Sequence, residues 1–306
     1  MRLRRFVAVA GAAMALVTGF AGAGAAYGSG SASAAPGCPK LNVIAIPGTW
    51  ETGDHRQHMS GPGMLGGVTR GLPSSTKVDY INYAASAFPW EGDVYGASKK
   101  QAVDNARGTI QAMSARCPGT RYAIVGYSQG ADAAGDLAAE IGTGLSPVRP
   151  ESIAGVGLIS DPSRSPSDIQ VGPRVGGAGA GGPRAGGFGF VSDRVRTICA
   201  PTDLYCSTED SDYVTRFAGF LAQASGASVT NLWRYQLEAG SIIGDVMAHG
   251  GIPMLQSQLT EGANRQRVQE LEKFYGSGAH TAYGSYSVGG GQSAISWMHN
   301  WIAGMG

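Results

Sequence analysis

The stretch Tyr122-Ala-Ile-Val-Gly-Tyr-Ser-Gln-Gly130 decides the fold of this chain. Its first four residues form a short apolar run that is typical of a buried strand. The turn Gly126-Tyr-Ser-Gln-Gly130 follows, and an alanine-rich helix is expected from there to about Ile141. A serine flanked by glycines between a strand and a helix occupies a sharp corner that lifts its hydroxyl above the sheet. The stretch therefore predicts an α/β fold and makes Ser128 the candidate nucleophile.

Other apolar runs on both sides of this stretch predict more strands and a long helix. Buried strands are expected over 41–46, 78–82, 153–159 and 195–198. Apolar residues spaced by three and four predict a helix over 94–115. Strands that alternate with helices are typical of a mostly parallel sheet covered by helices on both faces. The predicted architecture is therefore α/β.

Two segments interrupt this alternation. Residues 172–189 contain nine glycines in eighteen positions and are expected to form an irregular surface loop. Residues 207–275 keep a helical period and predict a helical insertion, with apolar stripes that include Phe217, Phe220, Leu221, Leu232, Trp233, Ile242, Ile243, Val246, Met247, Val268, Leu271 and Tyr275. These stripes either pack on the sheet as ordinary core helices or cover the substrate as a cap, and both interpretations stay open.

The N-terminus has the pattern of an export signal. Arg2, Arg4 and Arg5 precede an uncharged stretch over 6–26, and the small residues of 31–35 offer an Ala-x-Ala cleavage site. We expect cleavage after residue 34, which leaves 35–306 as one domain of an exported protein. The alternative is an uncleaved anchor, because the apolar stretch approaches the roughly 20 residues that span a bilayer.

The charge of the chain argues against nucleic acid as a partner. The formal net charge is +1, and it becomes −2 when the three arginines of the export signal are removed. The sequence has neither a basic patch nor a run of like charges. We therefore expect no nucleic-acid binding.

Four cysteines lie in the part that would be exported, at positions 38, 117, 199 and 206. An even number in an oxidising compartment favours two disulfides over free thiols. The sequence has no Cys-x-x-Cys pair and its five histidines are scattered, so no metal site is expected. Three connectivities are possible. We favour local closure of Cys199 with Cys206, which leaves Cys38 to pair with Cys117.

A serine nucleophile needs a base, and the base needs an acid that holds it. In this architecture the chain order is serine, acid and histidine, which excludes His55 and His58. His280 lies in a loop before the last predicted helix and is the candidate base. His249, at the end of a helix of the insertion, and His299, within the C-terminal helix, are the alternatives.

The acid and the oxyanion hole are expected at the ends of other strands. Asp203 follows the strand predicted over 195–198, and a disulfide between Cys199 and Cys206 would fix its carboxylate. Asp161 is the alternative acid. Gln129 follows the nucleophile, and its backbone N–H would donate a hydrogen bond to the developing oxyanion, together with Thr49 after the first strand.

These residues together resemble the cutinase family of serine esterases. The similarity covers most of 38–206 and the loop around His280, and its most specific part is Cys-x6-Cys with Asp203 at the fifth position. The resemblance implies an α/β-hydrolase fold, disulfides between the first and second and between the third and fourth cysteines, and an oxyanion contact from Thr49. It also implies hydrolysis of water-insoluble or lipid-like esters without a cofactor.

Two further segments resemble particular members of that family. Residues 182–189 look like the actinobacterial, mycobacterial-type enzymes, some of which act as envelope phospholipases and thioesterases. Residues 82–89, and the insertion that places Asp203 and His280 77 positions apart, are similar to mycobacteriophage lysin B, which cleaves mycolic-acid esters of the cell wall. This long gap is unlike the compact cutinases, and it makes a covered acyl-binding groove the expectation.

The resemblance implies a secreted or envelope-associated serine ester hydrolase. Its expected partner is a lipid or polyester-like ester substrate, with association at the envelope or membrane surface and a monomeric state as further expectations. An acyl (mycolyl) transferase and a non-catalytic envelope lipid-binding protein are the alternatives. The transferase would transfer the acyl group to an acceptor other than water. The lipid-binding protein would not use Ser128 as a nucleophile.

Overall fold

The computed structural model describes residues 37–53, 62–209, 211–225 and 232–306. The expected export signal at 1–34 lies outside these residues. Within the described ranges, no helix combines the length and the apolar character that crossing a bilayer requires.

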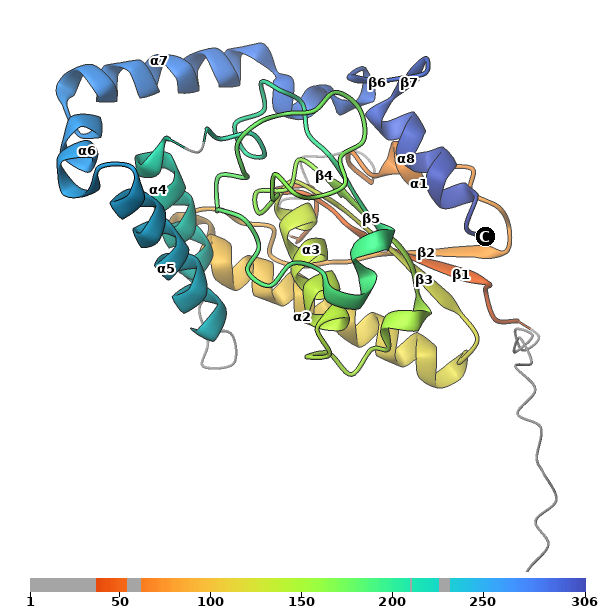
Figure 1. Ribbon diagram of the computed structural model, residues 1–306. Coiled ribbons are helices and arrows are strands. Elements are labelled where there is room, and N and C mark those ends of the chain that lie inside the picture. Colours follow the sequence, from red (N-terminus) through yellow and green to blue (C-terminus); the bar gives the residue numbers. More distant parts are fainter. Residues whose placement is uncertain (1–36, 54–61, 210, 226–231) are drawn as a thin grey trace, which may run out of the picture. The chain divides into compact units, whose positions relative to one another are not determined.

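Five parallel strands form the central sheet, which confirms the predicted α/β architecture (Figure 1). The strands are β1 (Leu41–Ile46), β2 (Thr76–Tyr80), β3 (Arg121–Tyr127), β4 (Ile153–Ile159) and β5 (Val195–Ile198). Their order across the sheet is β2-β1-β3-β4-β5. The chain reverses its direction of travel across the sheet between β1 and β3, and in such sheets ligands bind beyond the carboxyl ends of the strands at that point.

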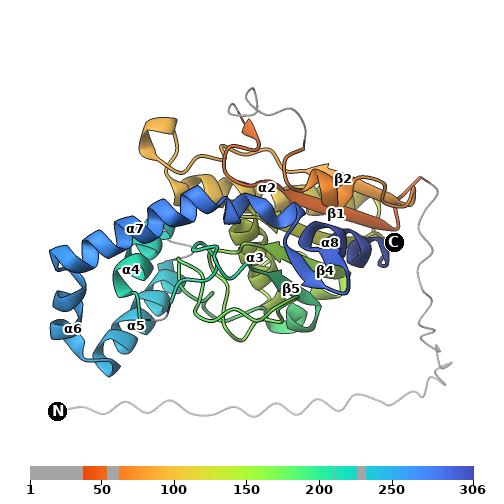
Figure 2. The same ribbon diagram turned by 90° about the horizontal axis from the view of Figure 1, so that it is seen from above.

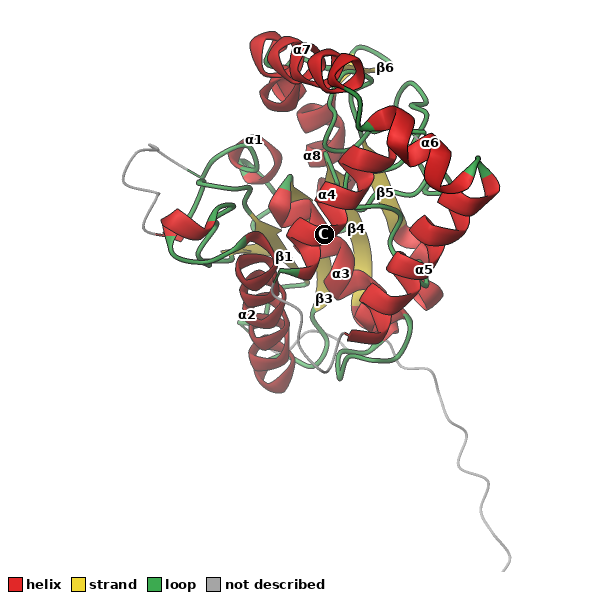
Figure 3. Ribbon diagram, turned by 90° about the vertical axis from the view of Figure 1, so that its left-hand side faces the viewer, coloured by secondary structure: helices red, strands yellow, loops and turns green. Residues whose placement is uncertain are grey.

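Helices cover both faces of the sheet, and the strand β1 is buried on both sides (Figure 3). The helices α2 (Tyr95–Arg116) and α3 (Gln129–Gly142) pack on one face with Ile44 and Ile46 of β1. The helices α1 (Gly66–Thr69) and α8 (Ala294–Ala303) pack on the other face with the alternate residues of the same strand, Leu41, Val43 and Ala45. This burial explains why β1 is apolar at every position except Asn42, rather than alternating between apolar and polar residues.

Shorter elements connect these layers. The 3₁₀ turns are η2 (Pro89–Glu91), η3 (Pro150–Ser152), η4 (Gly189–Arg194) and η5 (Ala279–Gly284). A small antiparallel ribbon of β6 (Ser287–Gly289) and β7 (Gln292–Ser293) precedes α8. Two disulfides are present, Cys38–Cys117 and Cys199–Cys206, as predicted. The first joins the segment before β1 to the end of α2, and the second closes the loop after β5.

The glycine-rich segment 172–189 differs from the surface loop that the sequence predicts. It is irregular, but two buried arginines hold it to the rest of the protein. Arg164 donates hydrogen bonds to the carbonyl oxygens of Gly176 and Gly177 at 2.7 Å, and Arg184 from within the segment is itself buried. A Cβ at Gly179 would lie 2.1 Å from the carbonyl oxygen of Pro162. At that position the absence of a side chain allows close backbone packing, a role that composition alone does not distinguish from flexibility.

Four helices occupy most of 207–277 and follow one another along the chain (Figure 2). They are α4 (Tyr213–Ala224), α5 (Leu232–Ala248), α6 (Gly251–Gln258) and α7 (Glu261–Ser277). Tyr213, Ile242 and Val246 form a small buried cluster of their own, separate from the cores on the sheet. Several residues of the predicted apolar stripes are instead exposed, namely Leu221, Ile243, Met247, Val268, Leu271 and Tyr275.

Candidate active site

Ser128 lies at the corner between β3 and α3 with a left-handed backbone, φ +56°. Its N–H donates a hydrogen bond of 2.9 Å to the carbonyl oxygen of Ile159 at the end of β4. The flanking glycines are sterically required, because a Cβ at Gly126 would lie 2.1 Å from the carbonyl oxygen of Gly130. A Cβ at Gly130 would lie 2.0 Å from the carbonyl oxygen of Ile46. The glycines therefore let α3 begin close to β1, with Ser128 above the sheet edge.

The structure brings Ser128, His280 and Asp203 together in one line of contacts. Ser128 Oγ lies 2.9 Å from His280 Nε2, and His280 Nδ1 lies 2.9 Å from Asp203 Oδ2. The Asp203 side chain is fully buried, whereas that of His280 is 20% exposed. A base that is partly open to solvent and an acid that is closed to it suit a site in which only the nucleophile and base meet a substrate.

The alternative residues lie elsewhere. His249 is exposed and follows α5, with Nδ1 2.8 Å from the carbonyl oxygen of Asp245 in that helix. His299 of α8 has Nδ1 2.9 Å from the carbonyl oxygen of Val68. Asp161 is buried against Arg184, whose Nη1 lies 2.9 Å from Asp161 Oδ2. None of these three contacts involves the Ser128–His280 pair.

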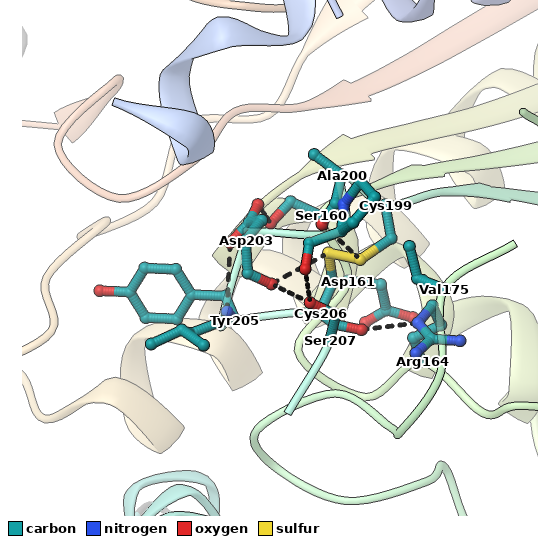
Figure 4. Close-up of a disulfide and its surroundings, with 12 residues drawn as sticks. Ser160, Asp161, Arg164, Val175, Cys199, Ala200, Asp203, Tyr205, Cys206 and Ser207 are labelled. Carbon is teal, nitrogen blue, oxygen red and sulfur yellow. Dashed lines mark hydrogen bonds between the residues drawn. A yellow bond between two sulfur atoms is a disulfide. The ribbon is translucent and has the colours of Figure 1, made fainter. Parts of the chain in front are cut away.

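Asp203 receives an unusually full set of hydrogen bonds. Oδ2 faces His280 Nδ1 and accepts from the hydroxyls of Ser160 at 2.6 Å and Tyr283 at 2.7 Å, while Oδ1 accepts from the N–H of Tyr205 at 3.1 Å. Burial alone would raise the pKa of Asp203, but the bonds from His280, Ser160 and Tyr283 hold the pKa below its ordinary value. The carboxylate is therefore stabilised as an anion. Figure 4 shows it in the loop closed by the Cys199–Cys206 disulfide, with Ser160 beside it.

Aromatic side chains surround the imidazole of His280. The ring centroid of Tyr205 lies 4.6 Å from that of His280, and the ring of Tyr127 stacks on it at 5.2 Å. Tyr127 also donates its hydroxyl to the carbonyl oxygen of His280 at 2.7 Å. Phe274, near the end of α7, lies 6.4 Å from His280 between ring centroids. The base is thus held from β3, from the disulfide loop and from the last helix of the 207–277 segment.

Thr49 contacts Gln129, the residue that follows Ser128. Thr49 follows β1, and its hydroxyl lies 3.5 Å from the side-chain oxygen of Gln129. Gln129 is the first residue of α3, where backbone N–H groups have no partner within the helix. Its side-chain amide donates to the carbonyl oxygen of Ser86 at 2.9 Å, which ties the loop after β2 to the helix. The Thr49 hydroxyl therefore lies beside the residue whose backbone N–H is the other predicted oxyanion donor.

Glu51 supports this loop and was not singled out by the sequence. Its two carboxylate oxygens accept from the N–H groups of Gly48 at 2.9 Å and Met64 at 2.8 Å. Burial raises the pKa of Glu51, although both backbone hydrogen bonds and His280 oppose that rise. Sequence reasoning also missed Ser160, Tyr205 and Tyr283. The only local signal was the position of Tyr283 three residues after the candidate base, which is one turn of a 3₁₀ helix.

The chain is similar to known proteins in sequence and in fold. The sequence model described as cutinase matches residues 37–231. The chain is 32% identical over 202 residues to the carboxylesterase Culp6 homolog of Corynebacterium glutamicum, covering 55% of this chain and 65% of that protein. It is 33% identical over 127 residues to carboxylesterase Culp1 of Mycobacterium tuberculosis, covering 42% and 50%. The matches thus span less than two thirds of the length of these relatives.

A solved structure with the same fold is that of lysin B from mycobacteriophage D29. It superposes with a TM-score of 0.50 at 16% identity, over 86% of this chain and 98% of lysin B. At this identity the likeness concerns the fold only. The match over 37–231 takes in Thr49, Ser128 and Asp203, and it covers more than half of the sequence. The chain therefore belongs to the cutinase family.

Proposed function

We propose that this protein hydrolyses carboxylic esters, with Ser128 as the nucleophile, His280 as the general base and Asp203 as the acid that holds the base. The observation that carries the proposal is the pair of 2.9 Å contacts that joins the three side chains through the two nitrogens of His280. Membership of the cutinase family and similarity to two carboxylesterases support the same reaction class.

In the first half of the reaction an acyl-enzyme forms. His280 Nε2 takes the proton of the Ser128 hydroxyl as Oγ attacks the carbonyl carbon of the ester. The carbonyl oxygen becomes an oxyanion, which accepts hydrogen bonds from the backbone N–H of Gln129 and from Thr49. The ester C–O bond then breaks, and His280 gives its proton to the leaving alcohol. The buried charge of Asp203 stabilises the imidazolium that exists between these two proton transfers.

In the second half water replaces the alcohol. His280 Nε2 takes a proton from a water molecule, whose oxygen attacks the acyl carbon and forms a second oxyanion at the same donors. The bond from the acyl carbon to Ser128 Oγ breaks, and His280 returns the proton to the serine. The products are the free acid and the unchanged enzyme, and no cofactor enters either half.

The proposed substrate is a lipid-like or cell-envelope ester, and the proposed location is outside the cytoplasm. The export signal expected at 1–34 and the two disulfides support export. We assign 207–275 as an insertion that covers the acyl group. Its support is the exposed apolar side chains of α4 to α7, together with the contact of Phe274 with the ring of His280.

The test is hydrolysis of p-nitrophenyl esters of increasing acyl length by the purified protein and by Ser128→Ala. We expect turnover in the native protein and a loss of at least about three orders of magnitude in the variant, because the nucleophile is removed. Ser152→Ala is a matched control, since this hydroxyl donates to the carbonyl oxygen of Arg149 away from the site. Equal turnover in Ser128→Ala and the native protein would contradict the assignment.

Product analysis separates hydrolysis from acyl transfer. With trehalose or glycerol present, a hydrolase releases free acid and leaves these alcohols unmodified. Formation of acylated trehalose or glycerol as the main product would instead assign a transferase. The rise of kcat/KM with acyl length identifies the lipid-like substrate class, and a preference for acetyl esters would contradict it.

A further inference from the structure

Ser160 has an uncommon backbone conformation at an informative place. In the described part of the chain, the non-glycine residues with positive φ follow β1, β2, β3 and β4 in turn, and they are Trp50, Ala85, Ser128 and Ser160. Ser160 has φ +56°, the same value as the candidate nucleophile. A non-glycine residue is strained in this region, and such strain gathers at functional sites. Glycine would adopt this backbone conformation without strain. The presence of serine at position 160 therefore indicates that its side chain has a role.

The Ser160 hydroxyl completes a closed triangle with the acid and the base. Its Oγ lies 2.6 Å from Asp203 Oδ2 and 3.0 Å from His280 Nδ1, and those two atoms lie 2.9 Å apart. Ser160 is fully buried. With its hydrogen donated to the carboxylate, Oγ presents a lone pair toward the hydrogen on Nδ1. That hydrogen is then shared between two acceptors, and the tautomer with a free Nε2 is favoured.

Tyr283 supplies a second donor from the element that carries the base. It lies three residues after His280 in η5, and the 3₁₀ period places such residues on the same side of the turn. Its hydroxyl donates to Asp203 Oδ2 at 2.7 Å and accepts from the N–H of Ala200 at 3.1 Å. Burial raises the pKa of Tyr283 well above its ordinary value, so this hydroxyl keeps its hydrogen. Two buried hydroxyls thus converge on the oxygen that faces the imidazole.

We propose that Ser160, with Tyr283 as a second donor, is a positioning residue that keeps the Asp203 carboxylate charged and aimed at His280 Nδ1. This inference rests on the proposed ester hydrolysis and deepens it, because neither hydroxyl touches the reacting atoms. Charge-assisted hydrogen bonds are the stronger kind, and a carboxylate held by three donors on one oxygen has little freedom to rotate away from the base.

The donors also set how strongly Asp203 favours the charged form of His280. Each hydroxyl withdraws negative charge from Oδ2, so removing one leaves the carboxylate a stronger partner for imidazolium. The other titratable groups that face the Asp203–His280 pair are Glu51, Tyr127 and Tyr205. These three groups are unchanged in the variants at Ser160 and Tyr283. Loss of a donor therefore moves the acid limb of the kcat/KM profile to higher pH.

Two substitutions at position 160 distinguish the effect of losing the hydroxyl from the effect of changing the backbone conformation. Ser160→Ala removes the hydroxyl and keeps Cβ, whereas Ser160→Gly removes it and supplies the residue that adopts φ +56° most easily. We expect kcat to fall about tenfold in both, with KM little changed, as for the loss of one hydrogen bond to a charged group. We expect Tyr283→Phe to act in the same direction. Ser114→Ala is the control, because that hydroxyl pairs with Tyr122.

A second measurement needs no turnover. The proton on His280 Nδ1 is observed by NMR at low field, and its resonance reports the tautomer and the hydrogen bond directly. We expect a sharp resonance in the native protein and in Ser114→Ala. In both position-160 variants we expect a shifted or exchange-broadened resonance, whose change in position on acidification, as Nε2 gains its proton, occurs at a higher pH than in the native protein.

The measurements distinguish a positioning role of Ser160 from a structural one. Native kcat, native pH profile and an unchanged Nδ1 resonance in both position-160 variants would overturn the inference. A loss in Ser160→Ala that is absent from Ser160→Gly would assign the effect to the backbone and would also overturn it. A lower kcat with an unchanged resonance and pH profile would make Ser160 merely structural. If the native protein hydrolyses no ester, the proposed function fails, and the resonance alone decides the role of Ser160.

Discussion

Ser128 and Ser160 contact opposite nitrogens of the same imidazole ring. Ser128 Oγ lies 2.9 Å from His280 Nε2, and Ser160 Oγ lies 3.0 Å from His280 Nδ1. The two serines share φ +56° and follow the neighbouring strands β3 and β4. Each N–H also donates to the last residue of the next strand, Ile159 for Ser128 and Ile198 for Ser160, at 2.9 Å. The sheet thus presents two equivalent hydroxyls, one toward the substrate and one toward the acid.

Thr49→Val tests the oxyanion contact. The variant loses the hydroxyl beside Gln129 but keeps its backbone N–H, so we expect kcat to fall about hundredfold, at the lower end of the effect of one oxyanion donor. KM should change little. Thr52→Val is the control in the same loop, because the Thr52 hydroxyl bonds to Asn82 Oδ1 at 2.7 Å instead. A similar loss in both variants would show that the loop, not the Thr49 hydroxyl, is responsible.

The two disulfides should differ in what they stabilise. On the chain-entropy model the loop closed by Cys38–Cys117 contributes about 4–5 kcal/mol and the short loop closed by Cys199–Cys206 about 2–3 kcal/mol. Replacing each pair by serines should therefore reduce the free energy of unfolding more for the long loop, as measured in denaturant.

Activity should rank the disulfide variants in the opposite order. Loss of the short loop frees Asp203, so we expect kcat to fall about hundredfold below the unfolding transition, as for a misplaced catalytic group. Loss of Cys38–Cys117 should leave kcat of the folded protein near the native value. Equal kcat in the two double variants would mean that the short disulfide does not position the acid.

Arg184→Met should strongly destabilise the protein. The guanidinium contacts Asp132, Asp136 and Asp161 in the buried region beneath α3, and Lys99 is the other cation there. Removing one partner of a buried ion pair costs about 3–5 kcal/mol, because the remaining charges lose their compensation. The exposed Arg70→Met should change the free energy of unfolding by less than about 0.5 kcal/mol.

The Arg184→Met deficit should shrink in acid. Burial raises the pKa of Asp161, and Arg184 opposes that rise, so its removal raises the pKa further. A carboxyl group with a raised folded-state pKa stabilises the fold below its unfolded pKa, and this contribution is lost as pH rises through the folded value. Denaturant curves between neutral and mildly acidic pH should therefore converge toward the native protein. A deficit that is constant with pH would contradict this account.

Glu51→Gln should alter both catalysis and the pH dependence of stability. An amide has one acceptor oxygen, so either Gly48 or Met64 loses its hydrogen bond, and we expect kcat to fall about tenfold as the Thr49 loop loosens. Burial raises the pKa of Glu51 in the folded protein. The native protein should therefore lose stability relative to the variant as the pH rises through this folded-state pKa. The exposed Glu151→Gln should show neither effect. Parallel stability curves for Glu51→Gln and the native protein would contradict the assignment.

Local pattern was enough to predict most of the sheet. The strands β1, β4 and β5 have the predicted bounds, because each is a buried apolar run whose signal lies in its own residues. The strand β2 lies at Thr76–Tyr80 rather than at 78–82. It is one of the two edge strands and is not fully buried, so its residues Lys77 and Asp79 stay polar and the apolar signal is weak.

Short motifs and their order along the chain were enough to predict which residues form the candidate site. The turn at Ser128, the frame around Asp203 and the loop at His280 were each visible as short motifs, and the structure brings these residues together. The helices of 207–277 were visible by their period, but the exposure of Leu271 and Tyr275 was not. Period shows which residues share a face of a helix, and it does not show what that face meets.

The amino-acid pattern alone is enough to specify the helices, the strands and the residue types at their ends, because secondary structure depends on contacts within a few positions. Tertiary structure alone decided that Ser160, 43 residues before Asp203, and Tyr283, 80 residues after it, would donate to the same oxygen. It also decided that Arg184 would be buried among three aspartates. Such contacts form only when the strands align at one edge of the sheet, and neither spacing nor composition encodes that alignment locally.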